Sequence, residues 1–189
     1  MTGTSPPMDP SSSEATKDQL DLALVQGRAY GDAVEHMVTR VAHDGGSEQV
    51  GPYEVGYAVE DAEGMYHLED GELVWHNPQQ ENTHLEIVVR DAADGRFVPC
   101  LDVRVELVSP SGERLGPERQ ELVWHPMMYH YGKNWTVPED GEYTVRVHID
   151  PPSFMRHDEI NGRRFAEPVE VELTGVKIQR GAEPVEPPE

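Results

Sequence analysis

The chain has 189 residues, of which 37% are hydrophobic, so it can bury one core of ordinary size. It carries 36 acidic and 15 basic residues, and the formal charge of −21 repels nucleic acid and anionic membrane surfaces while attracting cations. Its single cysteine excludes an intramolecular disulfide and a thiolate metal cluster, and no apolar run is long enough to insert into a membrane.

The N-terminal part of the chain is predicted to be helical after a disordered lead. Residues 1–15 are rich in Ser, Thr and Pro, and they are too polar to offset the entropy of ordering. Between about Lys17 and Ala42 apolar residues recur at helical spacing, which predicts one amphipathic helix or two short ones. Gly45-Gly46 is expected to end this helical extension of residues 16–46. The expected apolar stripe comprises Leu22, Val25, Ala29, Ala33 and Met37, with Tyr30, Val34, Val38 and Val41 beside it.

After Gly51 the hydrophobic period changes to two, which is typical of half-buried β-strands. Strands are predicted over 53–59, 84–89, 101–107, 119–124 and 143–149, in a hairpin over 66–75, and in a last pair at 169–173 and 176–178. This pattern predicts an all-β fold, an immunoglobulin-like antiparallel β-sandwich over residues 47–180 that carries the N-terminal helical extension. An acidic, Pro-rich tail over residues 181–189 follows, and neither tail is expected to contribute to a functional site.

His84 and Glu86 form the first part of a candidate metal site. The apolar side chains of Leu85, Ile87 and Val89 are expected to face inward, so His84 and Glu86 share the opposite face of the strand. Such a pair can bind one metal ion, although two polar residues that face water give the same pattern.

Two further segments carry candidate imidazole ligands. His125 and His130 lie between Trp124 and Gly132, in a predicted loop that is dense in Met and Tyr; the alternative is a loop that plugs the end of the sandwich. His157 follows a Pro-Pro break in a later loop. Imidazole nitrogens and one carboxylate suit Fe(II), Cu(II) or Zn(II), whereas Ca(II) and Mg(II) prefer an oxygen-only shell.

Three short motifs in this order resemble the Fe2+ transport protein family, dimeric periplasmic iron-uptake proteins with an immunoglobulin-like sandwich that bind copper or iron. The motifs are His-Leu-Glu at 84–86, His-Tyr-Gly at 130–132 and Arg-His-Asp-Glu at 156–159. The resemblance covers roughly Gly51 to Leu173. It implies His84, Glu86, His130 and His157 as ligands of an iron or copper ion, with zinc as an alternative.

The resemblance also implies a fifth ligand and partners. The family's fifth ligand is a methionine, and His125 falls where that methionine would be; Met127 and Met128 are alternatives. Exchange of thioether for imidazole disfavours Cu(I).

The implied partners are a second copy of the chain, with each site near the subunit interface, and a membrane iron permease. The family is exported, whereas residues 1–15 hold no cleavable signal, so the compartment is left open between the cytoplasm and an extracytoplasmic space.

Three functions are compatible with these residues. The leading hypothesis is a metal-binding protein of iron uptake or handling. No enzymatic activity is expected, because four imidazoles and a carboxylate would leave little room for a substrate. The second hypothesis is a non-haem Fe(II) oxygenase that uses His84 and Glu86 with a distal His. The third is a sandwich used only for protein contacts.

Overall fold

The computed structural model of the chain describes residues 8, 9 and 11–186. It contains one long helix, α1 (Lys17–His36), which a π-helical turn extends over Met37–Val41. The strands are β1 (Asp44–Val50), β2 (Tyr53–Glu60), β3 (Ala62–Glu63), β4 (Met65–Glu69), β5 (Glu72–His76), β6 (Thr83–Asp91), β7 (Asp102–Val108), β8 (Arg114–Trp124), β9 (Tyr129–Trp135), β10 (Gly141–Asp150), β11 (Val169–Ile178) and β12 (Ala182–Glu183). No helix in this described part of the chain has the length and apolar character needed to cross a bilayer.

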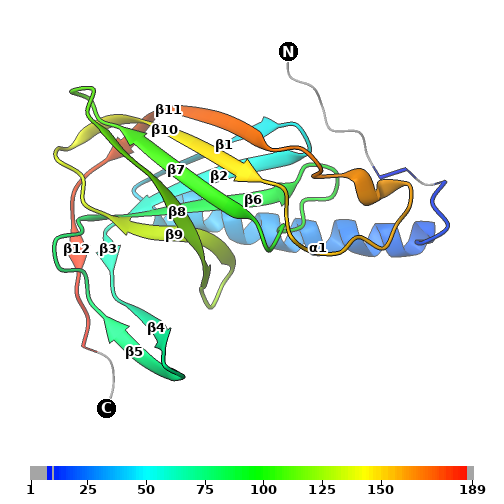
Figure 1. The fold of residues 1–189 in the computed structure, drawn as a ribbon, viewed down its shortest axis with the longest axis horizontal. Coiled ribbons are helices and arrows are strands. Elements are labelled where there is room, and N and C mark those ends of the chain that lie inside the picture. Colours follow the sequence, from blue (N-terminus) through cyan, green and yellow to red (C-terminus); the bar gives the residue numbers. More distant parts are fainter. Residues whose placement is uncertain (1–7, 10, 187–189) are drawn as a thin grey trace.

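Eight of the strands form one antiparallel sheet in the order β1-β2-β6-β9-β8-β7-β10-β11. The long strand β8 pairs with β7 through its first half and with β9 through its second half, so it passes from one layer to the other. The two outermost strands, β1 and β11, lie against each other, so the sheet folds over on itself (Figure 1). The predicted antiparallel β-sandwich with an N-terminal helix is therefore confirmed.

The core lies between the two layers, and it is built from the alternating apolar side chains that the sequence predicts. Leu85, Ile87 and Val89 on β6 are fully buried, as are Val103 and Val105 on β7. Burying each such side chain contributes about 1.5–3 kcal/mol relative to leaving it exposed. This packing fixes which face of β6 points inward, and it turns His84 and Glu86 to the opposite face.

Helix α1 covers part of that opposite face. Its first turn is held by a capping box between Thr16 and Gln19. Val34 near its end and Met37 in the π-helical turn pack in one buried cluster with Val88 of β6. In Figure 1 the helix runs alongside β2 and β6. The helix thus belongs to the same folded body as the sandwich.

The buried face of α1 differs from the predicted stripe. Leu22 and Val25 are exposed, while Ala23 and Gly27 are buried. A Cβ atom at Gly27 would lie 1.7 Å from the carbonyl oxygen of Asp94, so only glycine permits this close approach. The first half of the helix therefore packs through its small residues and not through its large ones.

Two predicted element boundaries were wrong. Gly45 and Gly46 do not end the helix; they lie in β1 and pair with Ala58 and Tyr57 of β2, so the sandwich begins at Asp44. The last two predicted strands are one strand, β11, because positive φ at Gly175 accommodates an irregularity without ending the pairing.

The described parts of both tails contact the body. Ser12 donates a hydrogen bond to Asp158 at 2.6 Å, and β12 pairs in parallel with β3. Residues 1–7, 10 and 187–189 lie outside the described part of the chain, so the disorder of the lead stays a prediction.

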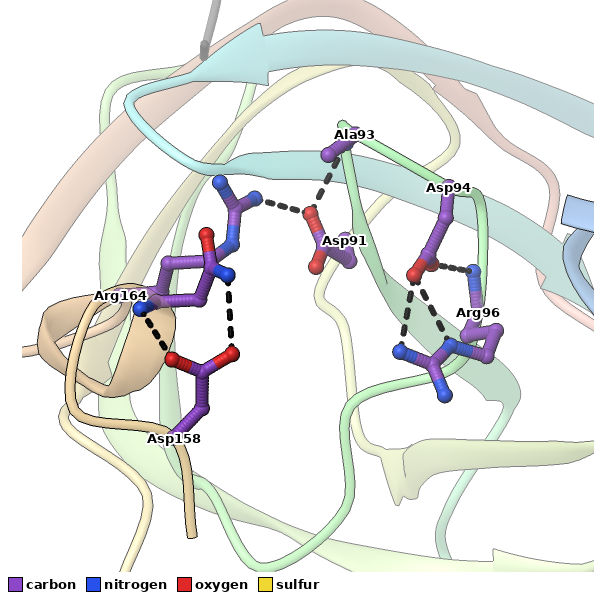
Figure 2. A network of polar contacts seen from close by, with 7 residues as sticks. Asp91, Ala93, Asp94, Arg96, Asp158 and Arg164 are labelled. Carbon is purple, nitrogen blue, oxygen red and sulfur yellow. Dashed lines mark hydrogen bonds and ion pairs between the residues drawn. The ribbon is translucent and has the colours of Figure 1, made fainter. Parts of the chain in front are cut away.

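The loop that follows β10 is held by a network of charged groups. Arg164 forms an ion pair with the buried Asp91 at the end of β6, and Asp91 also accepts a hydrogen bond from the backbone of Ala93 (Figure 2). Next to it, Asp94 pairs with Arg96 at 2.9 Å. The Arg164–Asp91 ion pair thus ties the loop that carries His157 to the end of β6.

Candidate metal centre

The structure brings His84 and Glu86 of β6 together with His130 of β9. One ligand atom from each of the three side chains lies within 4.8 Å of the other two, and His130 Nε2 is 3.4 Å from Glu86 Oε1. All three residues are buried, with relative exposures of 0%, 1% and 1%. The alternative of two polar residues that face water is therefore wrong.

His130 lies in a strand, not in the predicted loop. The segment Tyr129–Trp135 pairs with β6 as β9, because Tyr131 and Trp135 alternate into the core and leave His130 on the other face. The pairing sets Gly132 opposite Glu86, so His130 lies diagonally across from Glu86. The sheet register therefore assembles the three side chains.

Gly132 makes room for the two imidazoles. A Cβ atom at this position would lie 2.9 Å from His84 Nε2 and 3.0 Å from His130 Cδ2. The glycine is in the middle of β9, where it weakens the strand, instead of shaping a turn as its sequence context suggests. Its absent side chain creates the space between the rings.

Several buried polar atoms of this cluster have no hydrogen-bond partner among the described residues. They are His84 Nε2, Glu86 Oε2, His130 Nδ1 and His130 Nε2. Leaving one such atom unsatisfied costs about 1–3 kcal/mol, so native proteins rarely gather several at one place. A bound cation would accept the lone pairs of both imidazoles and of the carboxylate.

Asn134 fixes the orientation of the His84 ring. Its amide nitrogen donates to the backbone carbonyl of Glu63 at 2.7 Å, so its oxygen faces His84 Nδ1 at 2.9 Å. His84 therefore carries its proton on Nδ1 and presents the lone pair of Nε2 to the cluster. A hydrogen bond of this kind behind a histidine ligand is typical of metal sites.

Burial sets the protonation of the cluster. It lowers the pKa of His84 to about 4 and, together with the nearby His84 and His125, lowers the pKa of His130 to about 3. Burial, reinforced by the charges of Glu60 and Glu63, raises the pKa of Glu86 to about 8. Both imidazoles are thus neutral at pH 7, as metal ligation requires, and a cation would displace the proton of Glu86.

The other two predicted ligands do not join this group. His125 is half-buried in the loop between β8 and β9, where its Nδ1 accepts a hydrogen bond from the backbone of Met127 at 3.1 Å. It is close enough to influence His130 electrostatically. The side chain of His157 is 89% exposed and lies 2.5 Å from Glu14. Ligation by these two residues stays a prediction.

Sequence reasoning missed Gly132, Asn134 and Glu63. The alternation of His130, Gly132 and Asn134 was the available signal for the first two, once residues 129–135 are taken as a strand. No local signal indicates Glu63, because β3 reaches the cluster only through the fold.

The sandwich and its buried His-Glu-His cluster define a β-sandwich protein with a candidate site for a transition metal. Residues 45–176 match the sequence model of the family described as Fe2+ transport protein. The chain belongs to this family, as its motifs indicate. Helix α1 and strand β12 lie outside the matched segment.

Solved structures share the fold. P19 from Campylobacter jejuni, reconstituted with copper, is 18% identical with a TM-score of 0.60, and the match covers 73% of this chain and 96% of P19. FetP of uropathogenic Escherichia coli strain F11 is 21% identical with a TM-score of 0.57, over 71% of this chain and 95% of FetP. A copper-bound variant of FetP is 20% identical with a TM-score of 0.58, over 70% and 94% of the two chains. No curated protein matches the sequence significantly.

Proposed function

We propose that this protein binds iron for uptake or handling, with copper as a mimic, and that His84, Glu86 and His130 are ligands. The observation that carries the proposal is the convergence of buried ligand atoms without partners in one cluster. Membership of the Fe2+ transport protein family and the copper-bound relatives support the same role.

The donor set favours a borderline divalent ion. Two neutral imidazoles and one carboxylate suit Fe(II), Cu(II) and Zn(II), and a third imidazole from His125 would keep that preference. A thioether from Met127 or Met128 would shift the preference toward Cu(I). Iron is our preferred ion because the family is one of Fe2+ transport.

The burial of the three candidate ligands fits a role in metal binding and not in catalysis. Its three side chains are almost completely buried, and the cavities of about 520 and 480 Å³ elsewhere in the described structure are lined by other residues. An oxygenase remains the second candidate, because two histidines and one carboxylate also form the facial triad of non-haem Fe(II) enzymes. Oxygen consumption by the Fe(II)-loaded protein with candidate organic acids would support that candidate.

We also propose that the protein works as a homodimer, with a membrane iron permease as a further partner. The exposed His157 supports the homodimer, since its side chain lies outside the cluster of its own chain and on the surface, where a second copy can contact it. Sedimentation of the wild-type protein and of His157→Ala, with and without Cu(II), tests this proposal. A monomer under all conditions would contradict it.

Calorimetric titration of the stripped, full-length protein with Cu(II), Zn(II) and anaerobic Fe(II) tests the main proposal. We expect tight binding of one ion per chain that is lost in His84→Ala and in His130→Ala. His148→Ala is the matched control, because His148 is a partly exposed strand histidine beside Glu170 and Asp150. Weak binding that survives both ligand substitutions would mean attraction to the acidic surface alone.

A further inference from the structure

Glu63 lies beside the cluster without being part of it. Its Oε1 is 3.9 Å from the unpartnered Nε2 of His84. The side chain of Glu63 is 43% exposed, whereas that of His84 is completely buried. His84 Nε2 has no contact of its own with bulk water, so Glu63 is the side chain that links this ligand atom to the solvent.

We propose that Glu63 is the carboxylate through which a divalent cation reaches the buried site, and that it holds the ion together with His84 Nε2 before the ion settles between His84, Glu86 and His130. This inference rests on the proposed function and names the access route of the same site.

The spacing of the two atoms suits a shared ion. Carboxylate oxygens and imidazole nitrogens bind zinc-like ions at ~2.0–2.2 Å, so two ligands on nearly opposite sides of one ion lie up to ~4.2 Å apart. The separation of 3.9 Å between Glu63 and His84 falls inside this limit. An ion can thus bridge the two side chains without a change in the backbone.

Asn134 holds Glu63 and His84 in a fixed relation. Its amide group donates to the carbonyl of Glu63 at 2.7 Å and accepts from His84 Nδ1 at 2.9 Å. The side-chain oxygen of Asn134 also lies 3.4 Å from the backbone nitrogen of Glu63. One side chain therefore positions the backbone of the outer carboxylate and the ring of the inner ligand.

Two further carboxylates strengthen the attraction at this place. Glu60 pairs with His84 in the register of β2 and β6, and Glu183 pairs with Glu63 in the register of β3 and β12. Both act electrostatically on Glu63. A cation relieves the repulsion among these groups, and clefts lined by one sign of charge raise the local concentration of the opposite ion.

Glu63 transfers the ion and does not form a second metal site with a full set of ligands. Among the described residues, one group of side chains has its ligand atoms gathered within 4.8 Å, and Glu63 is outside it. A half-exposed carboxylate keeps its side-chain rotation, so it can release the ion inward. Glu183 lies beyond the segment that matches the family, so this part of the route is built by the chain's own C-terminal strand.

Stopped-flow mixing of the stripped, full-length protein with Cu(II) at low ionic strength, followed by quenching of tryptophan fluorescence, tests the proposal. We expect Glu63→Gln to slow association by roughly tenfold or more. Dissociation should slow by a similar factor, since the ion leaves by the same route, so the Kd changes little. Glu63→Asp keeps the charge but shortens the reach, and it should slow association similarly.

Glu183→Gln is the matched control, because it removes the same charge from the neighbouring strand. If the two Gln variants slow association equally and Glu63→Asp binds at the wild-type rate, Glu63 acts only through its charge and the proposal is wrong. Unchanged rates in Glu63→Gln would also overturn it. His130→Ala distinguishes failure of the access route from failure of the proposed function. If His130→Ala loses Cu(II) binding while Glu63→Gln has unchanged kinetics, the proposed function stands and the access route is wrong.

Discussion

Two places in this molecule bring two histidines and a glutamate close together, and they differ in burial. On the β4–β5 hairpin, His76 bonds to Glu69 at 2.7 Å, and the rings of His67 and His76 are 4.8 Å apart. The side chains of His76 and Glu69 are 49% and 52% exposed, so water and each other satisfy their polar atoms. The hairpin projects from the sandwich (Figure 1).

In the cluster of His84, Glu86 and His130 the same residue types are buried, and several of their polar atoms lack partners. The two places show that composition alone does not define a metal site. Desolvation distinguishes the metal site, because a cation strongly stabilises buried lone pairs that accept no hydrogen bond.

The largest expected difference between the two places concerns metal affinity. His130→Ala should weaken binding of Cu(II) by more than ~100-fold, since it removes a ligand from the buried cluster. His76→Ala should change it by less than about twofold, because an exposed pair gains little from binding an ion. Competition with a chromophoric chelator measures both values. Equal losses of Cu(II) affinity in His130→Ala and His76→Ala would contradict the proposed difference between the buried cluster and the exposed hairpin.

The space at Gly132 gives the next largest effect. In Gly132→Ala the new methyl group would press on both imidazoles, and we expect a loss of metal affinity of about 10–100-fold. Gly56→Ala on β2 is the matched control, since the nearest atom to its Cβ would be at 3.5 Å, an ordinary contact. Wild-type affinity in Gly132→Ala, with the fold retained by circular dichroism, would show that the rings do not need this space.

The hydrogen bond behind His84 should matter somewhat less. Asn134→Ala frees the His84 ring to rotate and to change tautomer, and it should lower metal affinity by about tenfold or more. Asn77→Ala removes comparable bonds, to Trp75 and Val185, away from the cluster and serves as the control. Equal affinities of the two variants would mean that Asn134 has no role in ligand orientation.

The smallest effect concerns the stability of the stripped protein. Burial raises the pKa of Glu86 to about 8 from an ordinary 4.5, so the stability that its protonated form provides falls as pH rises through this window. Burial lowers the pKa of His84 to about 4 from 6.5, so stability is also lost as pH falls from 6.5 to 4.

Glu86→Gln should therefore stabilise the stripped protein at pH 9, by on the order of 1 kcal/mol or more, while weakening its metal binding. Thermal unfolding between pH 5 and 9 measures this effect. A variant that is less stable than the wild type at pH 9 would contradict the assigned desolvation of the carboxylate.

The sequence predicts those parts of the site that depend on one strand alone. The alternation of Leu85, Ile87 and Val89 was sufficient to place His84 and Glu86 on one face. His130 lies in β9 beside His84 and Glu86 and not in the predicted loop. The loop prediction was wrong because Gly132, Lys133 and Asn134 are weak strand formers and hide the alternation of Tyr129, Tyr131 and Trp135.

What the sequence did not predict depends on register and close approach. The position of Gly132 opposite Glu86 follows from the pairing of β6 with β9, which are some 40 residues apart, and no local pattern specifies it. The contact of Glu63 with His84 requires β3 to lie over the end of β6. Likewise, the rotation of α1 follows from the contact of Gly27 with Asp94, where periodicity favoured Leu22 and Val25.

The most direct test is a crystal structure of the Cu(II)-loaded protein with anomalous diffraction at the copper edge. We predict a peak at ~2.0–2.2 Å from His84 Nε2, from a Glu86 oxygen and from a His130 nitrogen. A peak on the hairpin between His67, His76 and Glu69, or no ordered copper near His84, would contradict the central claim that desolvation creates this metal site.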